Sequence, residues 1–123
     1  MPKLTLLGAG LMMLVVGALH LIAPQMMMDT PKIALTSTNH FHVIRSAYGG
    51  AYIGIAALFL LGVLHPEHQR SSLLAVALLF FGFASGRLVS IMADGTPVVL
   101  YLAVMAFELV FALLAVLSLR RSE

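Results

Sequence analysis

The chain contains no cysteine and no tryptophan, and only 10% of its 123 residues are charged. Without cysteine it forms no disulfide and offers no thiolate for metal binding or nucleophilic catalysis. Soluble domains carry about 25% charged residues, so this chain has too few to cover a folded surface with polar side chains. Its seven lysines and arginines are scattered and form no basic stripe, which argues against nucleic acid as a partner.

Apolar residues make up 61% of the chain and gather in four long segments. The segments lie near residues 4–23, 40–64, 71–93 and 97–119. Each is close to the roughly 20 residues that a helix needs to cross a bilayer. The pattern predicts an all-α fold: a four-helix transmembrane bundle, residues 1–123 forming one domain with the lipid bilayer around it. Lys3 precedes the first segment, but no small-residue cleavage site follows, so we expect that segment to be retained.

Helix-start signals stand in both connections on one side of the predicted bundle. Thr30 before Pro31 predicts a short interfacial helix, and the polar run 36–39 offers N-caps for the second long helix. In the other connection Asp94 and Gly95 predict a turn, after which Thr96-Pro97 is expected to cap and open the fourth helix.

The orientation in the membrane follows from the positive residues in short loops. Lys3, Arg70, Arg120 and Arg121 fall on one side, and only Lys32 lies in a connection on the other. The count predicts that both termini are cytoplasmic, in a bacterial inner membrane. The connections that carry the helix-start signals then face the exterior.

Small residues recur at helical spacing in three of the segments, and such residues let helices pack closely in a membrane. They are the pair Gly50 and Gly54, the pair Gly82 and Gly86, and the stripe Gly10, Gly17 and His20. We expect them to lie at helix contacts within the bundle, with dimerisation of the chain as the alternative.

Polar side chains converge on the exterior half of all four segments. They are His20, His42, Arg45, Tyr48, Tyr52, Arg87, Asp94 and Glu108. At 1.5 Å per residue, Arg87 lies about 10 Å below the turn and Glu108 about 16 Å into its helix. A central arginine or aspartate in a membrane helix costs about 2.5–3.5 kcal/mol, so several at compatible depths predict a shared interior site.

Two functions fit that site. In the first, a pocket floored by Arg45, Arg87 and Glu108 binds a small amphipathic or anionic ligand, of the quinone or lipid head-group class. In the second, Arg87 pairs with Glu108 and Arg45 with Asp94, forming a structural network in an accessory or assembly subunit that docks on another membrane protein or a second copy. Proton-coupled transport through Glu108 is disfavoured because the cytoplasmic halves of the segments are apolar. No nucleophile and base motif is present, so catalysis is not favoured and no cofactor is indicated.

A metal site would have to draw on His20, His40, His42 and Glu108. On a helix His40 and His42 point about 200° apart and cannot share a metal ion. The neighbouring arginines would repel a cation, so no metal is expected.

The ordered motifs resemble those of a family of small bacterial four-helix membrane proteins. The motifs are Arg45-Ser-Ala-Tyr48-Gly49-Gly50, Gly86-Arg87-Leu88, Asp94-Gly95-Thr96-Pro97 and Glu108-Leu109. That family is a domain of unknown function, numbered four-three-four-five, and is similar to the broader DoxX-like group. The resemblance covers nearly the whole chain and implies the fold and these site residues, but it implies no reaction.

Overall fold

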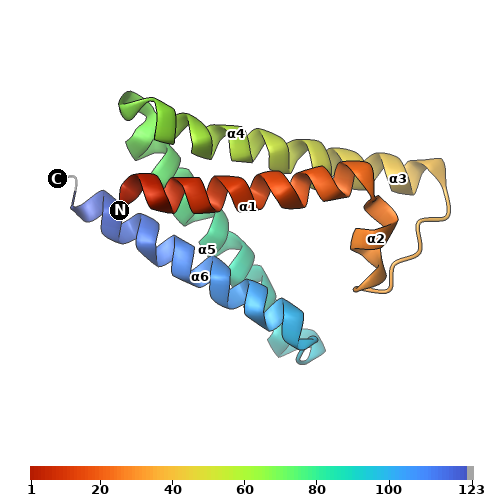
Figure 1. The fold of residues 1–123 in the computed structure, drawn as a ribbon. Coiled ribbons are helices and arrows are strands. Elements are labelled where there is room, and N and C mark those ends of the chain that lie inside the picture. Colours follow the sequence, from red (N-terminus) through yellow and green to blue (C-terminus); the bar gives the residue numbers. More distant parts are fainter. Residues whose placement is uncertain (122–123) are drawn as a thin grey trace.

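Long helices run side by side through the whole molecule in the computed structural model, which describes residues 1–121 (Figure 1). The long helices and the segments between them are α1 (Pro2–Ile22), α2 (Pro24–Asp29), α3 (Thr38–Ile44), η1 (Arg45–Gly50), α4 (Ala51–Leu64), η2 (Pro66–His68), α5 (Gln69–Asp94) and α6 (Val99–Arg120). Because α3, η1 and α4 are continuous, they form one long helix over 38–64. The predicted all-α bundle is confirmed, and the described residues contain no strand.

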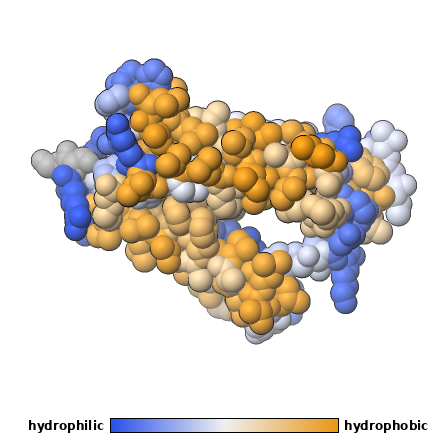
Figure 2. Space-filling model, viewed as in Figure 1, coloured by the Kyte–Doolittle hydropathy of each residue, from blue (hydrophilic) through white to orange (hydrophobic). Residues whose placement is uncertain are grey.

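Four of these helices are long and apolar enough to cross a membrane. Large apolar side chains face outward along them, among them Ile22 and Val99, each 80% exposed. Figure 2 shows the apolar colour covering most of the visible surface, with hydrophilic residues gathered toward the ends. Water would not solvate such a surface favourably. The chain therefore has the dimensions and the surface of an integral membrane protein.

The bundle consists of two helical hairpins that meet at one end and diverge at the other (Figure 1). The first hairpin pairs α1 with α4, and the second pairs α5 with α6; packing is most extensive within each hairpin. Both termini and η2 lie at the closed end, where the hairpins meet. The connections 23–37 and 95–98 lie at the open end.

The apolar core fills only the half of the bundle nearest the closed end. Its buried members are Leu6, Ala9, Met13, Ala56, Phe59, Leu73, Val76, Ala77, Phe80, Ala112 and Ala115. Ser72 adds a polar tie there, because its hydroxyl donates to the carbonyl of Leu58 across 2.7 Å and joins α5 to α4. Toward the open end buried side chains are few, and His20 and Glu108 are among them. The polar groups therefore stand where the core ends.

Close helix approach uses only some of the predicted glycines. Gly10 and Gly17 are buried, and a Cβ on Gly17 would meet the carbonyl oxygen of Gly49 at 3.0 Å. The stripe predicted on α1 is therefore confirmed. The two pairs at i and i+4 are not at helix contacts, since a Cβ on Gly54, Gly82 or Gly86 would meet nothing within 4 Å. The expectation for those pairs was wrong because they face outward from the bundle.

The open-end connections differ from the prediction in detail. The short helix is α2, which begins at Pro24, while Thr30 ends it instead of starting a new one. Ser37 caps α3 by accepting from the backbone N–H of His40, as the polar run predicted. Gly95 forms the predicted turn with φ 97°. The fourth helix begins two residues after Pro97 and has no side-chain cap, so the predicted role of Thr96 was wrong.

Gln25 organises the connection between α2 and α3. Its amide group donates to the carboxylate of Asp29 at 2.9 Å and to the carbonyl of Ile33 at 3.2 Å. Its carbonyl oxygen accepts from the N–H of Leu35 at 2.9 Å. These bonds hold a turn in which Lys32 adopts a left-handed φ of 59°. One side chain therefore fixes the path of a segment that has little apolar packing.

Replacing Gln25 with leucine is expected to loosen this connection while leaving the bundle folded. Three hydrogen bonds of about 1 kcal/mol each are lost, so amide exchange over 30–37 should speed up by at least about tenfold. Hydrogen–deuterium exchange read by mass spectrometry checks this. Met26→Leu is the matched control, since Met26 is an exposed residue of the same short helix. Equal exchange in both variants would contradict the role given to Gln25.

Candidate functional site

Arg87 and Glu108 form a two-pronged ion pair between α5 and α6. The Arg87 Nε–H donates to Glu108 Oε2 at 2.9 Å, and Nη2–H donates to Oε1 at 3.0 Å. This is the planar arrangement in which a guanidinium binds a carboxylate most strongly. The Glu108 side chain is only 4% exposed, whereas that of Arg87 is 33% exposed. The pairing expected from the sequence is present, and it leaves the arginine as the accessible partner.

The accessible side of Arg87 borders a cavity of about 140 Å³ between α5 and α6. It is lined by Arg87, Ser90, Ile91, Pro97, Tyr101, Leu102 and Met105. The Tyr101 ring lies against the guanidinium, with its centroid 5.8 Å from Cζ. A guanidinium has five N–H donors, and Glu108 occupies two of them. Arg87 therefore keeps three donors for a group that enters beside it.

Aromatic rings fill the space between the two hairpins next to this pair. The His20 ring stacks on Tyr48 at 5.6 Å and meets the edge of Tyr52 at 6.0 Å. Tyr52 in turn contacts Phe83 of α5 at 6.1 Å. Phe83 stands one helical turn before Arg87, so this cluster links the first hairpin to the helix that carries the ion pair.

His20 presents one unshared nitrogen to the cluster. Its Nδ1 lies 2.7 Å from the carbonyl oxygen of Val16, which only accepts, so Nδ1 carries the proton. In the neutral ring Nε2 is then a hydrogen-bond acceptor. The residue as a whole is 6% exposed, so the ring is held largely inside the bundle.

The aromatic cluster stands where the hairpins begin to diverge. Figure 2 shows the molecule hollowed between the hairpins toward the open end. We call this hollow the notch. The ring cluster of His20, Tyr48, Tyr52 and Phe83 bridges the two hairpins. Arg87, with its partner Glu108 and the adjoining cavity, stands one turn after Phe83 on α5. Of the predicted site residues, the structure brings together His20, Tyr48, Tyr52, Arg87 and Glu108.

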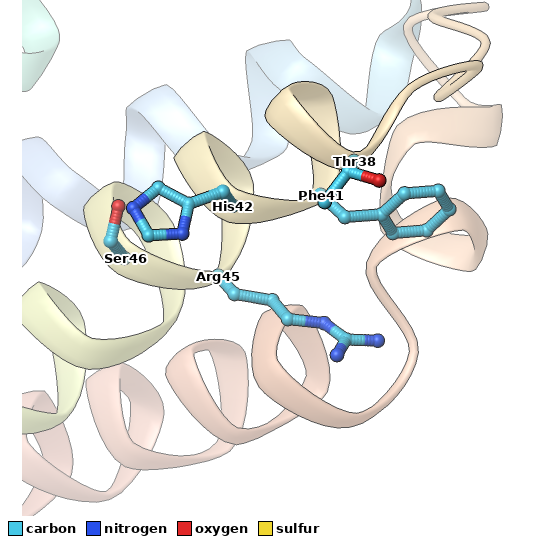
Figure 3. Close-up of a pocket in the computed structure, with 5 residues that line it drawn as sticks. All are labelled: Thr38, Phe41, His42, Arg45 and Ser46. Carbon is cyan, nitrogen blue, oxygen red and sulfur yellow. The ribbon is translucent and has the colours of Figure 1, made fainter.

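Arg45 and His42 lie in a separate groove on the outside of α3 and η1 (Figure 3). The physical reason is the π-helix over Arg45–Gly50. A π-turn contains one residue more than an α-turn, so it rotates the preceding residues by about 100° relative to regular α spacing. A regular helix would align Arg45 with Tyr52 at i and i+7. The structure instead leaves Arg45 exposed, against the Phe41 ring at 5.7 Å.

Asp94 is likewise outside the cluster. Its carboxylate accepts from the Ser90 hydroxyl at 3.2 Å, one turn earlier on α5, and the residue is exposed. Within residues 1–121 Arg45 has no carboxylate at ion-pair distance, so the predicted pair of Arg45 with Asp94 was wrong.

Several residues of these sites could not be identified from the sequence. Phe83 and Phe41 are aromatic residues in apolar runs, where they read as ordinary core. Thr38 and Ser46 read as helix-start and surface residues, although both line the outer groove. The histidines and carboxylates of the described residues form no group of three or more that could hold a metal ion.

Comparison with known proteins gives one result. The family model described as domain of unknown function (DUF4345) matches residues 1–119. No curated protein and no solved structure matches the chain.

Proposed function

Since this chain belongs to the DUF4345 family, a family defined without an activity, we propose its function from the notch: it binds a small amphipathic ligand of the quinone or lipid head-group class. The observation that carries this proposal is that Glu108 occupies only two of the five N–H donors of Arg87. Arg87 is fixed by both oxygens of Glu108, yet three of its five N–H donors remain available beside the cavity between α5 and α6.

The charge of the notch favours one part of this ligand class. Glu108 neutralises Arg87, and the second arginine lies in the outer groove instead of the notch. A neutral carbonyl oxygen therefore suits the remaining donors better than a phosphate or carboxylate would. His20 Nε2 supplies a complementary acceptor for a hydroxyl, and the tyrosines supply flat walls. A quinone and its quinol present this combination of groups.

The setting of the site follows from the positive residues. Four of the five positive residues in loops and termini lie at the closed end, which we propose to be cytoplasmic in a bacterial inner membrane. The notch then opens toward the exterior leaflet. A ligand with an apolar tail can enter it sideways from the bilayer.

Decylubiquinone in detergent micelles is a suitable probe for this function. Binding, followed by equilibrium dialysis and by a rise in Tm, is expected for the unaltered chain. The double variant Arg87→Gln/Glu108→Gln keeps a hydrogen-bonding pair and removes the guanidinium, so affinity should fall by at least about tenfold.

Lys32→Gln is the matched control, because it removes one positive charge at the open end without touching the notch. The proposal would be contradicted by a folded double variant whose affinity for decylubiquinone equals that of the unaltered chain. Running short-chain phosphatidate in parallel separates the two ligand classes. Tighter binding of phosphatidate than of the quinone would contradict the preference for a neutral carbonyl.

A structural role in an accessory or assembly subunit is the second candidate. Two observations favour it: both oxygens of Glu108 are already engaged, and Gly82 and Gly86 leave open space on the outer face of α5. Small residues on an outer face let another helix approach closely. In this case the ion pair pins α5 to α6, and the partner is a membrane protein or a second copy of the chain.

A further inference from the structure

The outer groove is an open depression of about 420 Å³ on the surface of the bundle. Its lining comes from one continuous helix face: Thr38, Phe41, His42, Arg45 and Ser46. Figure 3 shows the Arg45 side chain extending along the helix toward its Thr38 end, beside the Phe41 ring.

Arg45 brings an uncompensated positive charge to this groove. Its Cζ lies 5.7 Å from the centroid of the Phe41 ring, and no carboxylate of the described residues lies at ion-pair distance. It stands seven residues after the start of α3, about 10 Å along the helix. At that depth an arginine side chain extends toward the membrane surface, as it does here, and an anion there would stabilise its charge.

Figure 3 shows the Arg45 guanidinium on the Thr38 side of the groove, whereas the His42 ring points the other way, toward Ser46. The Thr38 hydroxyl and the His42 ring form no hydrogen bond with other described residues. The Ser46 hydroxyl donates to the carbonyl of Val43 at 3.2 Å, so its proton is already used within the helix. A tetrahedral anion on Arg45 would find the Thr38 hydroxyl as a further donor at the end of the groove toward which the guanidinium extends.

An apolar furrow continues from the groove along the outer face of α4. Gly50, Gly54 and Leu58 follow at intervals of four residues from the end of η1 along α4, and all three are exposed. A Cβ on Gly54 would meet nothing within 4 Å, and one on Gly50 would meet only the carbonyl oxygen of Arg45, at 3.8 Å. Missing side chains at two successive turns leave a shallow track on the surface that faces lipid.

We propose that this face binds one anionic phospholipid, with its phosphate on Arg45 and an acyl chain along the Gly50–Gly54 furrow. The charge of Arg45 is complementary to a phosphate, and the furrow continues along the same helix beyond the Ser46 end of the groove. The bilayer surrounds this face, so phospholipid is present there at high local concentration. This site is separate from the notch and does not depend on what the notch binds.

Native mass spectrometry of the detergent-solubilised chain with added phosphatidylglycerol tests the assignment. The unaltered chain is expected to retain one phosphatidylglycerol in preference to phosphatidylcholine. Arg45→Leu should reduce that retention by about tenfold, since it removes a charged hydrogen-bond donor. Gly54→Leu should reduce it comparably by filling the furrow, and the new side chain has open space in the fold.

Gly82→Leu is the matched control, because Gly82 is equally open but lies on α5. It is expected to leave phosphatidylglycerol retention unchanged. Equal retention by Arg45→Leu and the unaltered chain would overturn the proposal. So would inorganic phosphate that displaces the lipid irrespective of Gly54→Leu, because the site would then recognise a free anion. A dimer that Gly54→Leu dissociates would show that a second copy covers the furrow.

Discussion

Replacing Arg87 with methionine is expected to lower the free energy of unfolding by about 3–5 kcal/mol. The substitution leaves the Glu108 side chain, which is only 4% exposed, with neither of its two hydrogen-bond donors. A buried charge without a partner costs far more than the intact pair contributes, because its desolvation is no longer offset. No other described side chain donates to that carboxylate, so the fold offers no replacement for the lost guanidinium.

A double-mutant cycle measures the effect and separates it from lost packing. The unfolding of Arg87→Met, Glu108→Gln and the double variant is followed by circular dichroism during titration with a denaturing detergent. The double variant should recover most of the stability, since no charge then remains buried. Additive losses in the cycle would contradict a coupled pair. Arg120→Met, at the closed end of α6, controls for the general loss of an arginine.

The cycle also bears on the two candidate functions. If the pair serves only to pin α5 to α6, the double variant should regain both stability and any partner binding. If Arg87 serves a ligand, the double variant should regain stability but still fail to bind decylubiquinone. In the double variant, stability and binding are thus both restored if the pair is structural, whereas only stability is restored if Arg87 binds a ligand.

The sequence predicted the ion pair for a physical reason that holds across membrane proteins. A charged side chain in a membrane helix carries a high free-energy cost. Two of opposite sign at compatible depths are therefore expected to pair, because pairing lowers that cost. Arg87 and Glu108 satisfied that condition, and the structure joins them. The four helices were predictable for a similar reason, because length and apolar composition alone decide whether a helix can span lipid.

Periodicity could not place Arg45, because a π-helix is invisible to a pattern that assumes 3.6 residues per turn. The rotation separates Arg45 from Tyr52 and divides the predicted single site into a notch and an outer groove. Spacing also could not show whether Gly54 and Gly82 face another helix of the bundle or the outside. Small residues at i and i+4 identify one face of a helix, and only the packing of the whole bundle decides whether that face meets a helix or lipid.

Replacing Gly62 with alanine should destabilise the closed end by about 2–3 kcal/mol, a large effect for a single methyl group. The added Cβ would lie 2.6 Å from the Cβ of Ser72 and 2.9 Å from a methyl carbon of Leu6. The Ser72 contact is the decisive one, because a Cβ cannot rotate away and only a shift of α5 against α4 relieves the clash. That shift also strains the hydrogen bond from Ser72 to the carbonyl of Leu58.

Gly54→Ala is the matched control for this substitution, since it makes the same chemical change on the same helix in open space. Its stability should stay level or rise by up to about 1 kcal/mol, because alanine favours the helix over glycine. Thermal and detergent unfolding of the two variants side by side give the comparison. Similar stabilities would contradict the close approach of α4 and α5 at Gly62. A selective loss in Gly62→Ala would show that the hairpins are held together at the closed end, which leaves the other end free to stand apart around the notch.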